Sequence, residues 1–378
     1  MEGPRRVRKK EFNELMWFLE RVYGHPKGFF PLHYPAVWRE ETVDLENIFI
    51  IKEKGKIVSH VGLFPLNVRV GKKLAKVGGI GGVATLPEWR GKGLMTKLLN
   101  YAVKKMEEEK YSFSVLWGDR QRYGNFGYEL AGRQINLTLN KRSLEKMPNL
   151  SNLKLKRYEG KEIELKKIIS MHKKEPFSVQ RKDKDYKILL ERPDIVTYLG
   201  YKNREDAYLI LKENSVIEFG GNLEVILSSI FSLIQTFNLG NINISVPFKY
   251  PLLALFLKAT CVFSVSSFCM LKIIDLRRIL ETFIYQIEER YLKSGMTLKK
   301  AITLYLSGTE QKATLLFDKG IKISQKEVKD MVILPEQEMV KLLFGTLPPD
   351  SFLKLEKEKL FLNFFFPLDF YIWSLDSV

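Results

Sequence analysis

The sequence has few residues that form disulfide bonds or bind metal ions. Its 378 residues include two cysteines, Cys261 and Cys269, and four histidines. Two cysteines are too few for a disulfide framework, and they fit a protein kept in the reducing cytoplasm. The histidines are scattered and have no metal-ligand spacing with the cysteines. We therefore expect a cytoplasmic protein with no metal cofactor.

Long apolar runs are also missing. The longest one, residues 251–274, contains Lys258 and serines, and a lysine within a membrane span is costly. This run therefore predicts a buried helix followed by a strand, and we expect no membrane partner. The basic residues near the N-terminus are followed directly by Glu11 and Glu14, so no signal peptide is predicted.

Acidic residues are fewer than basic ones. The chain has 61 Lys and Arg against 44 Asp and Glu, a formal net charge of +17. Such an excess can attract nucleic acids, membrane surfaces or anionic ligands. Lysine and glutamate alternate over most of the chain, however, and no basic motif interleaved with aromatic residues is present. We therefore favour a solvated surface rich in both charges over a nucleic-acid interface.

Hydrophobic residues are plentiful, at 45% of the chain with 12% aromatic residues. A chain of this length can therefore form two or three domains with their own cores. In the first 140 residues, apolar spacing predicts helices over 11–22 and 93–109 and strands over 47–52, 57–70, 74–85, 111–117 and 128–139. An antiparallel meander followed by one strand–helix–strand crossover predicts a mixed sheet covered by helices.

The middle of the chain repeats this order, and the last hundred residues differ. A second α/β unit is predicted from helices over 162–173, 183–191 and 223–237 and strands over 194–201, 207–213, 215–220 and 242–246. A helix within 273–291, strands over 298–306, 313–317 and 320–323 and a helix over 335–344 follow. We expect an α/β (α+β) protein with domains at 1–140, 151–272 and 273–378.

The segment 83–96, VATLPEWRGKGLMT, joins a strand to a helix through a loop with two glycines and two basic residues. Unpaired N–H groups and the helix dipole favour an anion at such a helix start. Gly91 and Gly93 allow close approach to the backbone, and Arg90 and Lys92 add positive charge. The segment predicts a phosphate or pyrophosphate site. The alternative is a glycine turn that has only a structural role.

Two further features favour ligand binding. The strand before this loop has four glycines within residues 77–83 (VGGIGGV), which predicts a bulge or a backbone left free to meet a ligand. A second unusual block, YGNFGY, covers residues 123–128. Taken alone, Tyr123 in this block would be a packing aromatic beside Phe126 and Tyr128.

At these residues the sequence resembles a known family. The pattern Arg90-x-x-Gly93 between a strand and a helix is similar to the pyrophosphate motif of the GNAT acetyltransferase superfamily, although Met95 stands where that motif has Gly or Ala. Together, LPEWRGKGLMTKLL and RYGNFGYELAG resemble the enhanced-intracellular-survival (Eis-type) branch over residues 75–135. The resemblance implies tandem GNAT-like units, the second without a cofactor motif, and a C-terminal domain like sterol carrier proteins.

The resemblance also implies an activity and its residues. Members of the branch transfer acetyl from acetyl-CoA to amines and typically form hexamers. The implied general acid is Tyr123, which protonates the departing thiolate. Gly118 and Asp119 would lie near the thioester. The implied contacts to the pantetheine arm and the pyrophosphate come from Val83, Ala84 and Thr85 and from Arg90, Gly91, Lys92, Gly93, Leu94, Met95 and Thr96.

The implied base is the carboxylate of the last residue. The ending Trp373-x-x-Asp376-x-Val378 resembles the closing pattern of the branch, with Val378 where an aromatic residue is usual. A frayed terminus is the default alternative. The apolar run Phe364-Phe365-Phe366-Pro367 just before it predicts a tail that is held in place.

These observations lead to one main hypothesis and two alternatives. The main one is an N-acetyltransferase in which an amine attacks acetyl-CoA directly. The amine could belong to a small molecule, a polyamine or a protein lysine, and the protein is expected to be a homo-oligomer. The first alternative is a lipid or small-molecule binding protein whose GNAT cofactor site is not catalytic. The second is a nucleic-acid-associated protein, which rests on charge alone.

Overall fold

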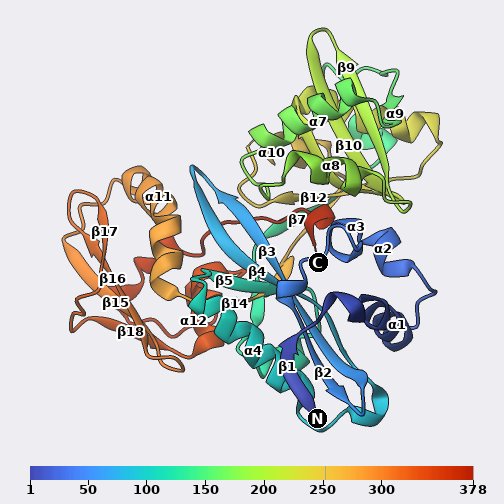
Figure 1. Cartoon of the computed structure of the whole chain (residues 1–378). Helices are drawn as coiled ribbons and strands as arrows, with labels where there is room; N and C mark the ends of the chain where they lie inside the picture. Colours follow the sequence, from blue (N-terminus) through green and yellow to red (C-terminus); the bar gives the residue numbers. More distant parts are fainter. Residues whose placement is uncertain (252, 378) are drawn as a thin grey trace.

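A computed structural model describes residues 1–251 and 253–377 of the chain. The protein has a mixed α/β fold with three sheets, each covered by helices (Figure 1). In the first sheet the strand order is β1-β2-β3-β4-β5-β14-β6. These strands are β1 (Glu2–Arg6), β2 (Ile48–Glu53), β3 (Lys56–Val70), β4 (Lys73–Thr85), β5 (Phe113–Leu116), β14 (Cys269–Ile273) and β6 (Glu129–Ala131).

The connections of the first sheet follow from its turns and its crossover helix. Lys54 and Gly55 both have positive φ, at 48° and 76°, as a two-residue hairpin between β2 and β3 requires. β1 to β4 are antiparallel, whereas β4 and β5 are parallel because α4 (Leu94–Glu108) connects them. One face of α4 is buried on the sheet, and its buried residues are Leu94, Leu98, Leu99, Ala102 and Met106. The other helices here are α1 (Phe12–Tyr23), α2 (Phe29–His33), α3 (Pro35–Trp38) and α5 (Arg120–Gly124).

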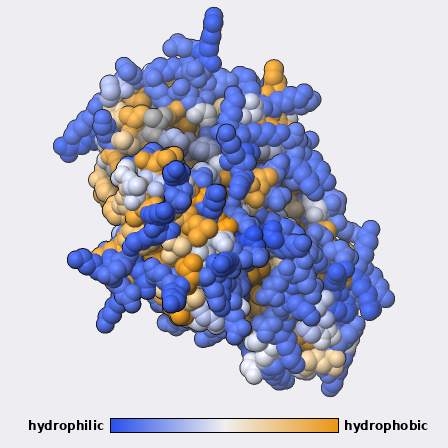
Figure 2. Space-filling view, turned by 90° about the vertical axis from the view of Figure 1, so that its left-hand side faces the viewer, coloured by the Kyte–Doolittle hydropathy of each residue, from blue (hydrophilic) through white to orange (hydrophobic). Residues whose placement is uncertain are grey.

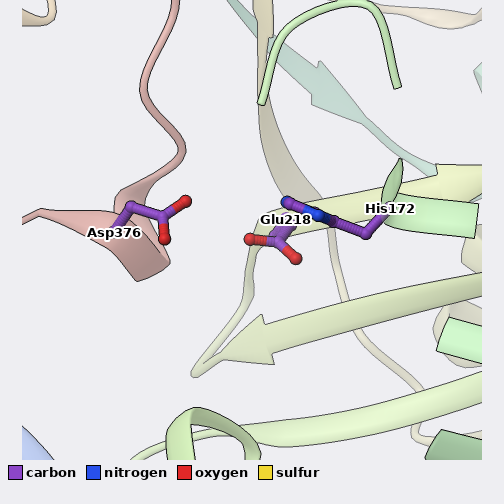
Figure 3. Close-up of side chains that lie close together, drawn as sticks. All are labelled: His172, Glu218 and Asp376. Atoms are coloured by element: carbon purple, nitrogen blue, oxygen red, sulfur yellow. The ribbon is translucent and has the colours of Figure 1, made fainter. Parts of the chain in front are cut away.

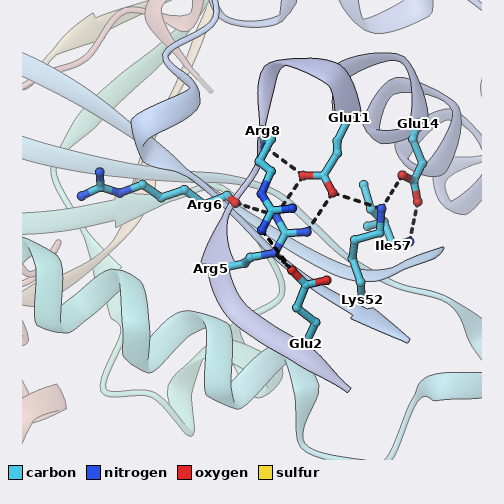
Figure 4. A network of polar contacts seen from close by, with 8 residues as sticks. All are labelled: Glu2, Arg5, Arg6, Arg8, Glu11, Glu14, Lys52 and Ile57. Carbon is cyan, nitrogen blue, oxygen red and sulfur yellow. Dashed lines mark hydrogen bonds and ion pairs between the residues drawn. The ribbon is translucent and has the colours of Figure 1, made fainter. Parts of the chain in front are cut away.

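A polar network ties the N-terminal strand to α1 (Figure 4). The Glu11 carboxylate accepts hydrogen bonds from the Arg5 guanidinium at 2.8 Å and from Lys52 Nζ at 3.1 Å. Glu14 accepts from Lys52 Nζ at 2.7 Å and from the Ile57 amide at 2.8 Å. The hydrogen bonds from Arg5 hold the pKa of Glu11 well below its ordinary value. Helix α1 is thereby fixed on β1, β2 and β3.

The second sheet has the strand order β13-β7-β12-β11-β10-β9-β8. Its strands are β13 (Val262–Ser266), β7 (Gln134–Leu139), β12 (Ile242–Pro247), β11 (Ser215–Gly221), β10 (Glu205–Lys212), β9 (Val196–Lys202) and β8 (Lys156–Arg157). The surrounding helices are α6 (Lys141–Leu144), α7 (Glu162–Lys174), α8 (Asp183–Leu190), α9 (Leu223–Thr236) and α10 (Leu253–Ala259). This unit stands above the first sheet in Figure 1.

The predicted domain boundaries at residues 140 and 272 would place β7 in the first sheet and β14 in the second. In the structure each of these two strands belongs to the other sheet. The predicted strand 128–139 is divided at Gly132, which has a φ of +73°. Its first part is β6 of the first sheet, and its second part is β7, which pairs with β12 and β13 of the second sheet. In return β14, from the predicted second domain, pairs with β5 and β6. The two sheets thus exchange strands and cannot be cut apart at either boundary.

The third sheet, β17-β16-β15-β18, belongs to the C-terminal part of the chain. Its elements are β15 (Lys300–Leu306), β16 (Gln311–Phe317), β17 (Ile321–Ser324), β18 (Met331–Leu334), α11 (Leu276–Ser294), α12 (Glu336–Phe344) and α13 (Leu362–Phe365). Aromatic rings pack in the core of this part: the ring centroid of Phe317 lies 5.0 Å from that of Phe365 and 5.7 Å from that of Phe361. The core continues without a break into β4, β5 and β14 of the first sheet.

The last residues of the chain leave this part and cross the molecule (Figure 1). Phe370 and Ile372 belong to the core of the third sheet, whereas Tyr371 and Trp373 belong to that of the second. The segment then forms a short 3-10 helix, η6 (Ser374–Asp376). The tail is therefore held in place, as the apolar run before it predicts.

The surface in Figure 2 is mostly hydrophilic, with apolar side chains gathered in a few patches. Among the described residues, no helix is both long and apolar enough to cross a membrane.

Candidate active site

The first sheet is open between β4 and β5. The two strands pair in parallel over only three positions, with Val77, Gly78 and Gly79 opposite Phe113, Ser114 and Val115. Beyond Gly79, β4 continues to Thr85 and keeps its pairing with β3. The backbone of residues 80–85 therefore has a free side where β4 and β5 diverge. A ligand can add to such a side like another strand.

A bulge lies in this free part of β4. The register with β3 shifts between His60 and Gly62, and Gly82 has a φ of +60°. His60 Nδ1 lies 2.5 Å from the Gly82 carbonyl oxygen. A Cβ at Gly82 would come within 2.9 Å of His60 and 3.0 Å of Trp38. The glycine is thus required here, and the bulge that the glycine-rich strand predicts is confirmed.

His60 is fully buried, and burial lowers its pKa to about 4. The ring is therefore neutral near pH 7. Because a carbonyl oxygen only accepts, the single ring proton belongs on Nδ1 and is donated to Gly82. Nε2 has no hydrogen-bond partner among the described residues. The histidine thus holds one carbonyl of the bulge in a fixed direction.

The next carbonyl of the bulge is held by a residue that the sequence analysis missed. Tyr23, the last residue of α1, donates its hydroxyl proton to the Val83 carbonyl oxygen at 2.9 Å. Burial raises the pKa of Tyr23 to about 12, with a further contribution from Tyr123. Tyr23 therefore stays protonated as a donor. No motif in the sequence connects Tyr23 with Val83, since sixty positions separate them.

A cavity of about 520 Å³ lies between the free part of β4 and the start of α4. Its lining includes nine of the residues expected to bind the cofactor, namely Val83, Ala84, Thr85, Arg90, Gly91, Gly93, Leu94, Met95 and Thr96. Val22, Tyr23, Trp89 and Arg122 complete it. Sequence reasoning had not included these four.

The loop at the mouth of this cavity suits an anion. Gly91 and Gly93 have φ of +75° and +70°, and a Cβ at either would meet open space. Gly91 and Gly93 flank Lys92, and Gly93 is the N-cap of α4 without a side-chain cap, so the N–H groups at this helix start can bind an anion. Arg90 donates from Nε to the Thr85 carbonyl at 3.3 Å, and Lys92 Nζ lies 4.0 Å from the centre of the Trp89 ring. The residues present therefore fit a pyrophosphate group.

Gly118 and Asp119 do not line this cavity. A Cβ at Gly118 would come within 2.4 Å of the Tyr123 ring, so the glycine leaves room for that tyrosine. Asp119 caps α5 by accepting a hydrogen bond from the Arg122 amide at 2.8 Å. Both residues thus help to position Tyr123, and the prediction that they lie near a bound thioester stays untested.

Tyr123 lies on α5, and 8% of the side chain is exposed. Its ring packs edge-on against Tyr128, with centroids 6.2 Å apart. A phenol can protonate a departing thiolate if its site lowers the pKa of the phenol, or if donation is concerted with thiolate departure. Burial instead raises the pKa of Tyr123, so concerted donation is the route that fits this site.

The other expected catalytic residue, Val378, lies outside the described residues. Ser377, the last one described, lines a cavity of about 330 Å³ together with Trp117, which directly follows β5. Asp376 forms a buried ion pair with Arg181, with Oδ1 2.7 Å from Nε. The side chain of Asp376 is therefore engaged and is a poor candidate for the base.

Comparison with known proteins agrees with this geometry. Residues 4–131 match the model of the acetyltransferase (GNAT) domain family. No curated protein matches the sequence. A probable N-acyltransferase from Enterococcus faecalis V583 is similar in structure, with a TM-score of 0.74 and 16% identity over 98% of both chains.

Two other solved structures have the same architecture. A GCN5-related N-acetyltransferase from Anabaena variabilis has a TM-score of 0.71 and 17% identity, and it covers 97% of this chain and 98% of its own. Eis1 from Mycobacterium abscessus has a TM-score of 0.67 and 10% identity with the same coverage. At these identities the likeness concerns the fold. The chain therefore contains a GNAT acetyltransferase domain over residues 4–131, and over its whole length it shares the fold of these solved structures, Eis1 among them.

Proposed function

We propose that the protein transfers an acetyl group from acetyl-CoA to a primary amine. The observation that carries the proposal is the cavity between the free part of β4 and the glycine loop at the start of α4. It offers an unpaired strand side for the amide groups of a pantetheine arm and outward N–H groups for a pyrophosphate. These are the two chemically distinct parts of coenzyme A.

We assign the binding roles from the family resemblance, and the cavity supports them, because all of these residues except Lys92 line it. In this proposal Val83, Ala84 and Thr85 pair with the pantetheine arm, and Arg90, Gly91, Lys92, Gly93, Leu94, Met95 and Thr96 surround the pyrophosphate. Tyr23 already donates to the Val83 carbonyl, and Ser59 Oγ donates to the Ala84 carbonyl at 3.1 Å, so we propose that the backbone amides of the bulge are the main contacts to the pantetheine arm. Gly118 and Asp119 act through Tyr123, whose place they define.

The chemistry is a direct transfer. The lone pair of the amine nitrogen forms a bond to the acetyl carbon, and the carbon–sulfur bond breaks. Tyr123 donates its phenolic proton to the departing sulfur. The proton lost from nitrogen goes to a carboxylate, which we propose to be that of Val378. The cavity shared by Ser377 and Trp117 supports this, because it joins the end of the described chain to the end of β5.

The direct test is acetyl transfer itself. Purified protein is mixed with acetyl-CoA and a panel of small amines, polyamines and lysine peptides, and free thiol is measured. We expect thiol release that depends on one class of amine, together with acetylated product of matching mass. Tight coenzyme A binding without turnover on any amine would instead favour a binding protein with a non-catalytic site.

We also propose that the protein assembles with copies of itself, and the family resemblance points to a hexamer. Strand β13 is an edge strand of the second sheet, and three apolar residues on it are exposed: Val262 (64%), Phe263 (56%) and Val265 (42%). Residues 261–270 carry no charge in a chain with 28% charged residues. Such an uncharged edge suits the same strand of another copy.

A further inference from the structure

The second sheet contains the same kind of opening as the first. β11 and β12 are parallel and pair at only two positions, with Ser215 opposite Asn243 and Val216 opposite Ile244. β11 continues to Gly221 and β12 to Pro247 after the strands diverge. No glycine-rich loop like that of residues 90–93 follows β11, since α9 begins directly at Leu223 after its cap Asn222.

The C-terminal segment lies against the diverging parts of these two strands. Trp373 is fully buried, and its ring packs edge-on against Phe219 of β11 at 4.9 Å. Its Nε1–H donates to the Phe177 carbonyl at 2.8 Å. Helix η6 contacts β11 directly, and Ser374 and Ser377 line one cavity with residues of both β11 and β12. The chain's own tail thus lies where a ligand would enter this opening.

One buried arginine connects the tail to the sheet. Arg181 Nε and Nη2 donate to the two oxygens of Asp376 at 2.7 and 2.8 Å. The same guanidinium donates to Glu218 of β11, with Nη1 3.0 Å from Oε1 and a second contact from Nη2. Tyr208 also donates to Glu218, at 3.0 Å. The guanidinium thus donates four hydrogen bonds to two carboxylates. An ammonium has three protons and no planar fork, so this geometry needs arginine.

The same acidic groups could in principle hold a metal ion. Ligand atoms of His172, Glu218 and Asp376 lie within 4.8 Å of one another (Figure 3). In Figure 3, Asp376 extends from the tail toward Glu218 on the sheet. The guanidinium of Arg181 already pairs with both carboxylates, however, and His172 shares a hydrogen bond of 2.8 Å with Tyr186. This cluster is therefore occupied by a cation of the chain itself.

We propose that the second GNAT-like unit is a dock for the C-terminal segment, with Arg181 as the positioning residue that fixes η6 on β11. The opening that holds the cofactor in the first sheet holds residues 371–377 in the second. Docking places Ser377 on the cavity that is also lined by Trp117, at the end of β5. Each chain then binds one molecule of coenzyme A, since its second opening is filled. The expected effect of docking on turnover rests on the proposed function, whereas the docking of the tail does not depend on it.

The experiment compares three variants of the full-length protein with the wild type. Asp376→Asn weakens the tail contact and keeps the pair between Arg181 and Glu218. Arg181→Met removes both pairs. Arg192→Met is the matched control, because Arg192 forms a comparably buried pair with Asp194 in the same unit, at 2.9 Å, without touching the tail. Carboxypeptidase digestion of the native proteins is followed by intact mass, and coenzyme A binding is measured by calorimetry.

We expect residues 373–377 to be released at least tenfold faster from Asp376→Asn than from the wild type and the control. Coenzyme A should bind at one site per chain, with an affinity within twofold of wild type in Asp376→Asn. If an amine substrate is found, kcat should fall and the KM for acetyl-CoA should stay unchanged. Equal release from Asp376→Asn and Arg192→Met, or a second equivalent of bound coenzyme A, would overturn the dock. Failure of every amine would overturn the proposed function and leave the digestion result standing.

Discussion

Tyr123 and His60 are buried polar side chains in the first unit, and both are uncharged near pH 7: His60 because burial lowers its pKa to about 4, and Tyr123 because a phenol titrates well above pH 7. Their roles differ because their contacts differ. Tyr123 packs edge-on against Tyr128 and is 8% exposed, and in the proposed function its hydroxyl faces the ligand. The His60 ring is committed to the Gly82 carbonyl. The first residue is therefore placed for proton transfer, and the second for shaping the backbone.

Replacing Tyr123 with phenylalanine tests the proton donor. The ring contact with Tyr128 remains, so we expect folding and coenzyme A affinity to be unchanged. Turnover should fall by roughly 10² or more, as for the loss of a general acid. Steady-state kinetics beside calorimetric titration separate the two effects. Turnover within twofold of wild type would make Tyr123 a packing residue.

Replacing His60 with leucine tests the bulge. The Gly82 carbonyl would lose its donor, and a buried unpaired group costs about 1–3 kcal/mol. We expect a lower melting temperature and at least fivefold weaker coenzyme A binding. His60→Asn, whose Nδ2 takes about the place of Nδ1, should recover much of the affinity.

A matched control for this variant is His172→Leu. His172 is as buried as His60, and burial is the main cause that lowers its pKa, to about 3. Its Nε2 also has no hydrogen-bond partner among the described residues. It lies in the second unit, so the control should lower stability and leave coenzyme A affinity unchanged. An equal loss of affinity in both variants would reduce His60 to a stability role.

At the scale of elements, Glu175 joins the end of α7 to β11. Its carboxylate accepts from Tyr250 at 3.0 Å and from the Gly221 amide at 3.3 Å. Burial raises the pKa of Glu175 to about 7, and the nearby Glu218 adds to this. The folded state therefore holds a proton that the unfolded chain releases near pH 4.3.

The sign of the resulting pH dependence is fixed by this shift. The contribution of protonated Glu175 is fully present below about pH 4.3 and is lost as pH rises through about 7. Glu175→Gln should remove this dependence and raise the free energy of unfolding at pH 8 by up to about 3 kcal/mol. Urea unfolding at pH 5, 6.5 and 8 measures it. An unchanged difference between pH 5 and pH 8 in the variant would show that Glu175 is not the titrating group.

The elements also show how far sequence patterns reach. Sequence patterns predict the bulge or free backbone of β4 and the glycine loop. Glycines within a strand, as at 78–82, indicate a bulge or close approach of a ligand, and glycines at a helix start, as at 91 and 93, allow an anion to approach the backbone. The exchange of β7 and β14 between sheets was not predicted, because an alternating strand pattern specifies a buried face and not a partner strand. The role of Tyr23 was not predicted either, because its contact with Val83, sixty positions away, exists only in the folded chain.

At the scale of the molecule, the tail links the cores of the second and third sheets, while β13 leaves an apolar edge exposed. Phe263→Glu should break an assembly through this edge and shift the particle to a smaller mass in light scattering. Phe364→Glu is the control, since Phe364 is exposed to a similar degree, at 57%, on α13 of the C-terminal part. A smaller particle with both variants, or with neither, would contradict assembly through β13.

The central claim is that coenzyme A binds at the loop before α4, and a pair of glycine variants tests it directly. Gly93 and Gly295 have φ of +70° and +64°, and a Cβ at either meets open space. Valine therefore strains both positions alike, but only Gly93 faces the cavity. By calorimetry, Gly93→Val should bind coenzyme A at least tenfold more weakly, about 1.4 kcal/mol, while Gly295→Val matches wild type. Equal affinity in both variants, with both folded, would contradict the site.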